Sequence, residues 1–418
     1  MDSPLTTNLM VRCEALHSYT LRRSIAAIPL PLRGNFTPLD SRMARTFLNV
    51  QSRGHASVKP QSSKPSTSPS ESATRGGPSR MGESSNELAA LAMLGSKRPR
   101  APVRAPATVV EDRLNHVVVQ APYLPEHVLD EFIRLMRPGG STVRLPLATG
   151  DAYRLHDVGR VAPERAMQLQ ALADRHGVDT AVVPGWRSID RVGLVASDMD
   201  STLILGECID AIARKWQSIL DARCVTGRDI GKQIEAITTR AMNGEIDFAE
   251  SLRERVALLE GFPVSELREV YREHVELSPG AREMIAAFKG VGAEVGVLSG
   301  GFTHFTAPLK ADLGLDFQAA NVLETDGEVL TGRVIGEVFD ALAKADQVRA
   351  RRPAGAMAAA VGDGSNDVPM LGEADVGIAY HAKNGVAEAA RKRGGVIHEV
   401  KHTGLDALPN LFLSRVGS

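Results

Sequence analysis

Carboxylates gather at two points of the chain. Asp198 and Asp200 flank a single residue after the apolar run Val192–Ser197. Asp363 and Asp367 lie four residues apart after a second apolar run. Two like charges this close raise each other's cost of ionisation unless a cation or a shared proton relieves them. Four acids with no Cys or His inside either motif favour a hard, oxygen-binding cation, which indicates Mg²⁺ rather than zinc. A lone pair of acids is also typical of a strand that runs into an acidic turn, so the rest of the chain must decide.

Three further residue types suit a phosphate. Ser299 offers a hydroxyl, and Gly300 with Gly301 lets backbone N–H groups approach an anion closely. Lys344 would help to neutralise both the acids and a bound phosphate, although taken alone it would be a solvated helix residue. Together these residues predict a site for an anion and a divalent cation.

Such a site needs strands that end at one edge of a sheet. Apolar segments at Val192–Ser197, Glu294–Leu298 and Ala356–Val361 alternate with helical patterns, which predicts an α/β fold with a doubly wound parallel sheet. Ligands bind at the carboxyl ends of the strands in such sheets. One candidate residue lies just past each predicted end: Asp198, Ser299 and Asp363.

About a hundred residues separate the first acidic pair from Ser299, far more than a strand crossover needs. The surplus predicts a helical cap, about residues 206–276, inserted after the first strand. Its helices are expected at Cys208–Lys215, Ile230–Met242 and Asp247–Glu260, and Asp247 with Glu250 is typical of a helix start.

The 418 residues allow two or three domains. Residues 1–105 hold 15 basic and 6 acidic residues, a net charge of +9, whereas the remainder holds 34 basic and 44 acidic residues, a net charge of −10. Because Ser57–Arg80 is rich in Ser, Pro, Gly and Lys, we interpret residues 1–105 as a disordered basic leader. Its scattered arginines resemble an organelle transit peptide, and translation from an internal Met explains them equally well.

The order of strand and helix patterns in residues 106–190 predicts a small α/β module of regulatory or dimerising type. Residues 191–418 are expected to form the domain that carries the acids. Strands are expected in the module at His116–Gln120, Val143–Pro146 and Thr180–Pro184, with helices at Pro125–Met136 and Pro163–His176.

Neither a nucleic acid nor a membrane is an expected partner. The basic segment Lys97–Arg104 lacks interleaved aromatics, which favours a linker over a nucleic-acid patch. No apolar run approaches the roughly 18 residues of a membrane helix. Three cysteines without a C-X-X-C motif favour a reducing compartment, which predicts a cytoplasmic location unless the leader directs the chain to an organelle.

The acids, the glycine pair and the lysine occur in a familiar order. DMDST (198–202), SGG (299–301), Lys344 and GDGSND (362–367) resemble the four motifs of the haloacid dehalogenase superfamily of phosphohydrolases. The resemblance covers roughly residue 190 to the C-terminus and implies that Asp198 attacks phosphorus to form an aspartyl-phosphate. It implies that Asp200 acts first as acid and then as base. The phosphate ligands it implies are Ser299, Gly300, Lys344 and Asn366, and the Mg²⁺ ligands are Asp198, the Asp200 backbone carbonyl and Asp363, oriented by Asp367.

Further segments look like the phosphoserine phosphatase family: ECIDAIA (207–213), TRAMNGEIDFAESLRERVALLEG (239–261), LSGGFTHF (298–305) and IAYHAK (378–383). In that family an acid holds the substrate amine, the first arginine of the SLRxRV segment holds its carboxylate, and a Met and a Phe line the pocket. These positions here are Glu207, Arg253, Met242 and Phe248.

The resemblance implies Mg²⁺-dependent hydrolysis of O-phospho-L-serine as the last step of serine biosynthesis. It also implies an ACT-like amino-terminal module, with a homodimer as one assembly. Two alternatives stay open. One is a phosphotransferase or phosphatase for another small phosphomonoester. The other is a non-catalytic amino-acid sensor that kept the fold.

Overall fold

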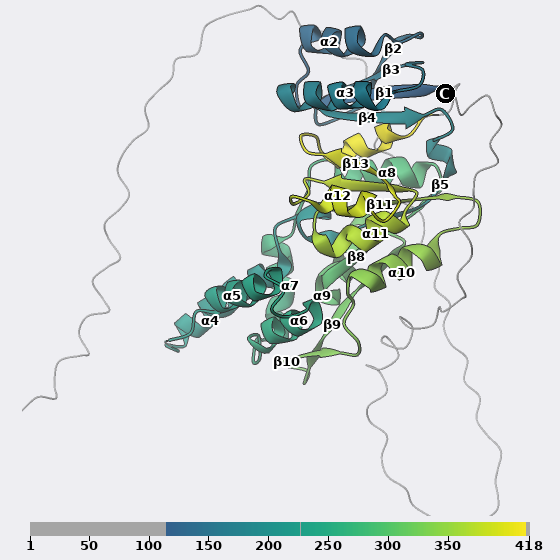
Figure 1. Ribbon diagram of the computed structural model, residues 1–418. Coiled ribbons are helices and arrows are strands. Elements are labelled where there is room, and N and C mark those ends of the chain that lie inside the picture. Colours follow the sequence, from purple (N-terminus) through teal and green to yellow (C-terminus); the bar gives the residue numbers. More distant parts are fainter. Residues whose placement is uncertain (1–113, 226, 415–418) are drawn as a thin grey trace, which may run out of the picture. The chain divides into compact units, whose positions relative to one another are not determined.

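The computed structural model describes residues 114–225 and 227–414 (Figure 1). The chain divides into two units, residues 1–79 and 80–418, and every described residue belongs to the second. The predicted leader, residues 1–105, therefore lies outside the described residues. The predicted domain limits at residues 105 and 190 stay predictions.

A central sheet of seven strands carries most of the described chain. Its strand order is β10-β9-β8-β5-β11-β12-β13. All neighbouring strands are parallel except β9 and β10, which confirms the predicted, largely parallel α/β sheet. The strands are β5 (Val192–Ser197), β8 (Glu294–Phe302), β9 (Phe317–Thr325), β10 (Leu330–Ile335), β11 (Met357–Gly362), β12 (Val376–Tyr380) and β13 (Val396–Val400).

The inner strands are buried on both faces, which explains why their sequences read as continuous apolar runs. Every residue of β11 is buried. Neighbouring residues of β5 serve different cores, because Leu194 packs in one apolar cluster and Val195 in another. The connecting helices are α8 (Ala281–Gly290), α9 (Thr303–Leu313), α10 (Ala341–Arg351), α11 (Val368–Glu373) and α12 (Val386–Arg391). Within residues 114–225 and 227–414, no helix has both the length and the apolarity that crossing a bilayer requires.

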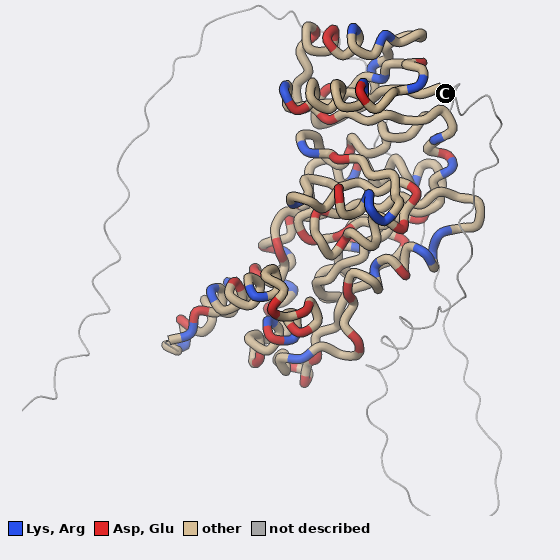
Figure 2. Tube along the Cα trace, viewed as in Figure 1, with Lys and Arg blue, Asp and Glu red and all other residues tan. Residues whose placement is uncertain are grey.

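The helical insertion after β5 is present. It consists of α4 (Cys208–Ala222), α5 (Ile230–Met242), α6 (Phe248–Ala257) and α7 (Val264–His274), and the paired strands β6 (Ile204–Leu205) and β7 (Glu276–Leu277) close its neck. The first helix runs seven residues beyond its predicted end at Lys215. The predicted helix start is confirmed, since the Asp247 side chain accepts a hydrogen bond from Glu250 N at 2.7 Å. Figure 2 shows acidic and basic residues interspersed along α4 and α5.

The amino-terminal module is a four-stranded antiparallel sheet with two helices. Its strand order is β2-β3-β1-β4. The elements are β1 (Asn115–Ala121), α2 (Glu126–Met136), β2 (Thr142–Leu145), β3 (Asp151–Leu155), α3 (Pro163–His176) and β4 (Asp179–Pro184). Strand β3 is missing from the sequence prediction. One of its inward residues is Arg154, which is 3% exposed, so the charge hides the apolar pattern.

Polar contacts join the module to the last segment of the chain. Asp179 at the start of β4 accepts hydrogen bonds from three consecutive backbone N–H groups, those of Lys401, His402 and Thr403, and from the Thr403 hydroxyl at 2.7 Å. Arg154 donates to the carbonyl oxygens of Asn410 and Phe412 at 2.9 and 2.7 Å, respectively. These contacts tie the module to the chain beyond β13.

Replacing Asp179 with alanine should lower the free energy of unfolding by about 3 kcal/mol, because three backbone N–H groups and the buried Thr403 hydroxyl lose their acceptor. Urea denaturation would measure the change. Asp174→Ala, on the exposed face of α3, is the matched control and should change stability by less than about 0.5 kcal/mol. Equal denaturation midpoints for the wild type and the Asp179 variant would show that the contacts add nothing to stability.

Candidate active site

Three predicted site residues come from neighbouring strands at the centre of the sheet. Asp198 follows β5, Asp363 follows β11, and Ser299 lies within β8. All three are buried. Asp198 N donates to Val361 O at 2.9 Å, which holds the end of β5 against β11. Strand β8 was expected to end at Leu298, but it continues through the serine and both glycines.

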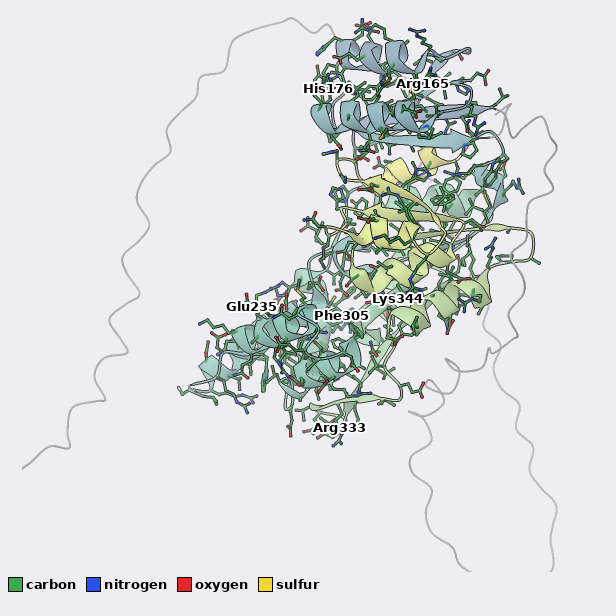
Figure 3. All side chains as sticks on the ribbon, in the orientation of Figure 1. Arg165, His176, Glu235, Phe305, Arg333 and Lys344 are labelled. Atoms are coloured by element: carbon green, nitrogen blue, oxygen red, sulfur yellow. The ribbon has the colours of Figure 1, made fainter. Side chains whose placement is uncertain are left out.

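Lys344, which Figure 3 labels, lies on α10. Its side chain is fully buried, and Nζ donates to Asp198 Oδ1 at 2.6 Å and to Asp367 Oδ1 at 2.8 Å. Burial by itself lowers the pKa of Lys344, but the two carboxylates raise it overall, so the lysine stays charged. Burial raises the pKa of Asp198 well above its ordinary value, Asp367 adds to the rise, and Lys344 opposes it. Losing either partner would leave a buried charge uncompensated.

The carboxylates of Asp198, Asp363 and Asp367 form a buried triad in which one oxygen of each lies within 4.8 Å of one oxygen of the other two. Three acids facing two lysines, Lys344 and Lys383, leave negative charge that a cation can offset. Because every donor is an oxygen, the triad fits a hard divalent ion. Asp363 also accepts a hydrogen bond from Thr202 Oγ1 at 3.3 Å and lies 3.3 Å from Lys383 Nζ.

The carboxylate of Asp200 is not part of the triad. Its Oδ1 accepts from Cys208 N at 2.8 Å, and its Oδ2 accepts from the Ser299 hydroxyl at 3.2 Å. Burial raises the pKa of Asp200, although the Cys208 hydrogen bonds oppose the rise. A carboxyl group that holds a proton more readily than usual is suited to general acid catalysis. The expected metal contact of Asp200 through its backbone carbonyl stays a prediction.

Gly300 and Gly301 leave space that a side chain would fill. A Cβ at Gly301 would lie 2.9 Å from Asp200 Oδ2 and 3.0 Å from Ser299 Oγ, so a side chain would crowd the acid. A Cβ at Gly300 would lie 3.1 Å from Phe248 Cζ and 3.8 Å from Asn366 Nδ2. Phe248 of the cap and Asn366 of the loop after β11 therefore both face the glycine pair.

Glu207 stands at the start of α4, beside the turn that carries Asp200. Ser201 Oγ donates to its Oε1 at 3.1 Å, and Ser201 holds a left-handed backbone with φ of 56°. Although solvent reaches the Glu207 side chain, desolvation by the surrounding protein raises its pKa to about 7. The negative charge of Asp200 adds to the rise. The structure thus places Glu207 next to the acids, at the entrance of the site.

The structure does not bring Arg253 to this entrance. Its side chain is exposed on α6, five residues after Phe248, which on a helix is far around the axis from the face that meets Gly300. Arg255 follows Phe248 by seven residues and so shares its face. Burial lowers the pKa of Arg255, whereas the charges of Glu207 and Asp210 raise it. Arg255 therefore lies within electrostatic reach of Glu207.

Two more residues differ in how the structure relates them to the site: Met242 is exposed, and Lys383 contacts Asp363. Met242, at the end of α5, is 81% exposed. Lys383, in the segment IAYHAK, donates from its backbone N to Asp363 O at 2.9 Å. Its signal in the sequence was a lysine in a turn after another parallel strand, β12.

The chain shares this arrangement with known proteins. A family model of haloacid dehalogenase-like hydrolases matches residues 195–372. A phosphoserine phosphatase of Albidiferax ferrireducens is 42% identical over 228 residues, which are 52% of this chain and 89% of the relative. That of a Polaromonas species is 44% identical over 206 residues, 47% of this chain and 82% of the relative.

Solved structures extend the likeness. A probable phosphoserine phosphatase from Vibrio cholerae superposes with a TM-score of 0.56 at 29% identity, covering 72% of this chain and 87% of that one. A hydrolase of the haloacid dehalogenase family from Salmonella enterica superposes with a TM-score of 0.59 at 27% identity, covering 71% of this chain and 98% of that one. Each of these alignments covers a larger share of the chain than residues 191–418 make up. The structural likeness therefore includes residues before the sheet of seven strands. The chain therefore belongs to the phosphoserine phosphatase family of haloacid dehalogenase-like hydrolases.

Proposed function

We propose that this protein hydrolyses O-phospho-L-serine to L-serine and phosphate through a phosphoryl group carried on Asp198. The observation that supports this most directly is that Glu207 contacts Ser201 in the turn that carries Asp200, and that Arg255 lies within electrostatic reach of Glu207. A carboxylate and a guanidinium at the entrance suit the α-ammonium and the α-carboxylate of one small amino acid, respectively.

The chain's own groups account for both steps. Asp198 attacks phosphorus while the bond from phosphorus to the serine oxygen breaks, and Asp200 gives its proton to the departing oxygen. Asp200 then takes a proton from water as that water attacks phosphorus, which frees phosphate and restores Asp198. Lys344 compensates the negative charge between nucleophile and phosphate throughout.

Magnesium is the cation that we propose for this site. Asp198, Asp363 and the Asp200 backbone carbonyl would hold it, and Asp367 would orient them while it also receives Lys344. When bound, it supplies positive charge that lets a carboxylate approach a phosphate. Ser299, Gly300 and Asn366 would hold phosphate oxygens.

A panel of phosphate esters tests this function. The kcat/KM for O-phosphoserine should exceed that for O-phosphoethanolamine, which lacks the carboxylate, and that for 3-(phosphonooxy)propionate, which lacks the amine, by about 100-fold or more. Phosphate release with no added acceptor is the measurement. Strong preference for another member of the panel, or transfer that requires an acceptor, would reject the proposal.

Glu207 should give the reaction a characteristic pH dependence. Its raised pKa, about 7, means that the carboxylate loses its charge, and with it the ammonium contact, as the pH falls through that value. The ratio of kcat/KM for phosphoserine to that for p-nitrophenyl phosphate should fall about tenfold between about pH 8 and about pH 6. Glu207→Gln should remove this fall in the ratio at low pH. A ratio independent of pH in the wild type would exclude Glu207 as the amine ligand.

We also propose that the protein supplies the last step of serine biosynthesis in the cytoplasm, and that it forms a homodimer through the ACT-like module. Cys208 and Cys224 are free thiols, which suits a reducing compartment. Strand β2 is an exposed edge of the module sheet, a surface that another strand can pair with. Light scattering during size-exclusion chromatography would determine the assembly.

A further inference from the structure

The ladder between β8 and β9 is interrupted where the phosphate site begins. Leu298 pairs with Ala319 and Phe302 pairs with Asn321, so three residues of β8 stand opposite one residue of β9. A bulge of this kind removes backbone groups from the ladder and leaves them without strand partners. The backbone groups released here belong to Ser299, Gly300 and Gly301.

The side chain of Asn321 takes up these groups. It is 3% exposed, and its Nδ2 donates to Gly300 O at 2.9 Å and to Gly301 O at 3.3 Å. The N–H on the other side of the Gly300–Gly301 peptide bond donates to Ser299 Oγ at 2.8 Å. This peptide unit is therefore held at both its carbonyl and its amide, which fixes its orientation beside Asp200.

The same side chain reaches a third segment. Asn321 Oδ1 accepts from Phe339 N at 2.7 Å, and Nδ2 lies 3.4 Å from Phe339 O. The next residue, Asp340, caps α10 by accepting from Leu342 N and Ala343 N, both at 2.9 Å. Helix α10 carries Lys344, so one buried amide joins the glycine turn to the start of the lysine helix.

We propose that Asn321 is a positioning residue for phosphoryl transfer, which orients the Gly300–Gly301 peptide and sets the start of the Lys344 helix relative to it. The inference deepens the proposed function and rests on it only for the identity of the natural substrate. Every substrate carries the phosphoryl group past this turn, so the loss of Asn321 should affect all phosphate esters alike. A cap residue such as Arg255 should affect phosphoserine alone.

The test compares Asn321→Ala and Asn321→Asp with Asn410→Ala. Asn321→Asp keeps an acceptor for Phe339 N–H, but it replaces the donor Nδ2 with an oxygen that faces the carbonyl oxygens of Gly300 and Gly301. This variant provides the test if the alanine variant does not fold. Asn410 is the matched control because it is also a buried asparagine, 7% exposed, whose Nδ2 donates to Pro146 O at 3.1 Å away from the acids. Each protein is measured for its unfolding midpoint, its affinity for inorganic phosphate, and kcat/KM for phosphoserine and p-nitrophenyl phosphate.

In both Asn321 variants, kcat/KM should fall about 10- to 100-fold, and the fall should be similar for the two esters. The affinity for inorganic phosphate should fall in parallel. Asn410→Ala should keep both within about twofold while its unfolding midpoint falls. Phosphate affinity and kcat/KM that stay within twofold of the wild type in the Asn321 variants would overturn the proposal, and so would a loss confined to phosphoserine. Failure of the wild type to prefer phosphoserine would reject the proposed function instead, and the phosphate and aryl ester measurements would still test Asn321.

Discussion

Replacing Asp198 with asparagine should lower kcat for phosphoserine by about 10⁴-fold or more. A carboxamide oxygen is a poor nucleophile, so the first step has no substitute within the site. Binding should respond differently. Lys344 would keep one carboxylate partner, Asp367, in place of two, and the site would become more positive. Inorganic phosphate should therefore bind the variant at least as tightly as it binds the wild type.

Asp200→Asn is the matched control for this prediction, since it removes one carboxylate from the same turn. The variant should also hydrolyse phosphoserine slowly, because the departing serine oxygen no longer receives a proton. With p-nitrophenyl phosphate, whose leaving group needs no proton, it should release about one equivalent of nitrophenol rapidly and then stall. Asp198→Asn should show no such burst. Turnover by the Asp198 variant above about a tenth of the wild-type rate would exclude the covalent route.

The parallel sheet was predictable because its strands are buried on both faces. Val192–Ser197 matches β5 at both ends, and the predicted third strand differs from β11 by one residue at each end. A nearly continuous run of apolar residues marks such strands in the sequence without reference to the strands beside them. The acids that follow these strands were therefore placed correctly at one edge.

Strand β8 shows where an apolar pattern fails to predict the end of a strand. Ser299, Gly300 and Gly301 are polar or small, so the apolar run ends at Leu298, and the expected strand ended with it. The structure continues β8 through Phe302 because Asn321, distant in sequence, satisfies the carbonyl groups that the bulge leaves unpaired. A contact of this kind depends on the pairing of two strands and leaves no local trace.

The acid cluster shows a second limit. The sequence motifs gave Asp367 an orienting role behind the metal ligands, and the structure places its carboxylate in the triad with Asp198 and Asp363. Lys344 bridges Asp198 and Asp367, and this contact depends on how α10 packs against the sheet. Which oxygens remain for a cation is set by that packing, which spacing along the chain does not encode.

The choice between two arginines was, by contrast, open to a geometric argument. An α-helix turns about 100° per residue, so positions seven apart share a face and positions five apart do not. Phe248 faces Gly300 in the structure. The arginine on the same face is therefore Arg255. Assignment of the carboxylate role to Arg253 followed its place in a motif and neglected this periodicity.

Arg255→Ala should raise KM for phosphoserine by about 100-fold, because the α-carboxylate loses a charge-assisted contact in a partly desolvated site. The kcat/KM for p-nitrophenyl phosphate and for O-phosphoethanolamine should change by less than about threefold, since neither ester carries that carboxylate. Steady-state kinetics with the three esters is the measurement. Arg255→Lys should recover part of the loss, because an ammonium keeps the charge but not the paired geometry of a guanidinium.

Arg253→Ala is the matched control, on the same helix and two residues away. Its side chain is exposed, and it should leave KM within about twofold for every ester. Equal losses in the two variants would show that α6 acts through its total charge rather than through one contact. A loss in Arg253→Ala alone would restore the assignment made from the motif, and it would require the cap to rotate α6 by more than a third of a turn when substrate binds. The pair of variants therefore decides which face of α6 recognises the substrate.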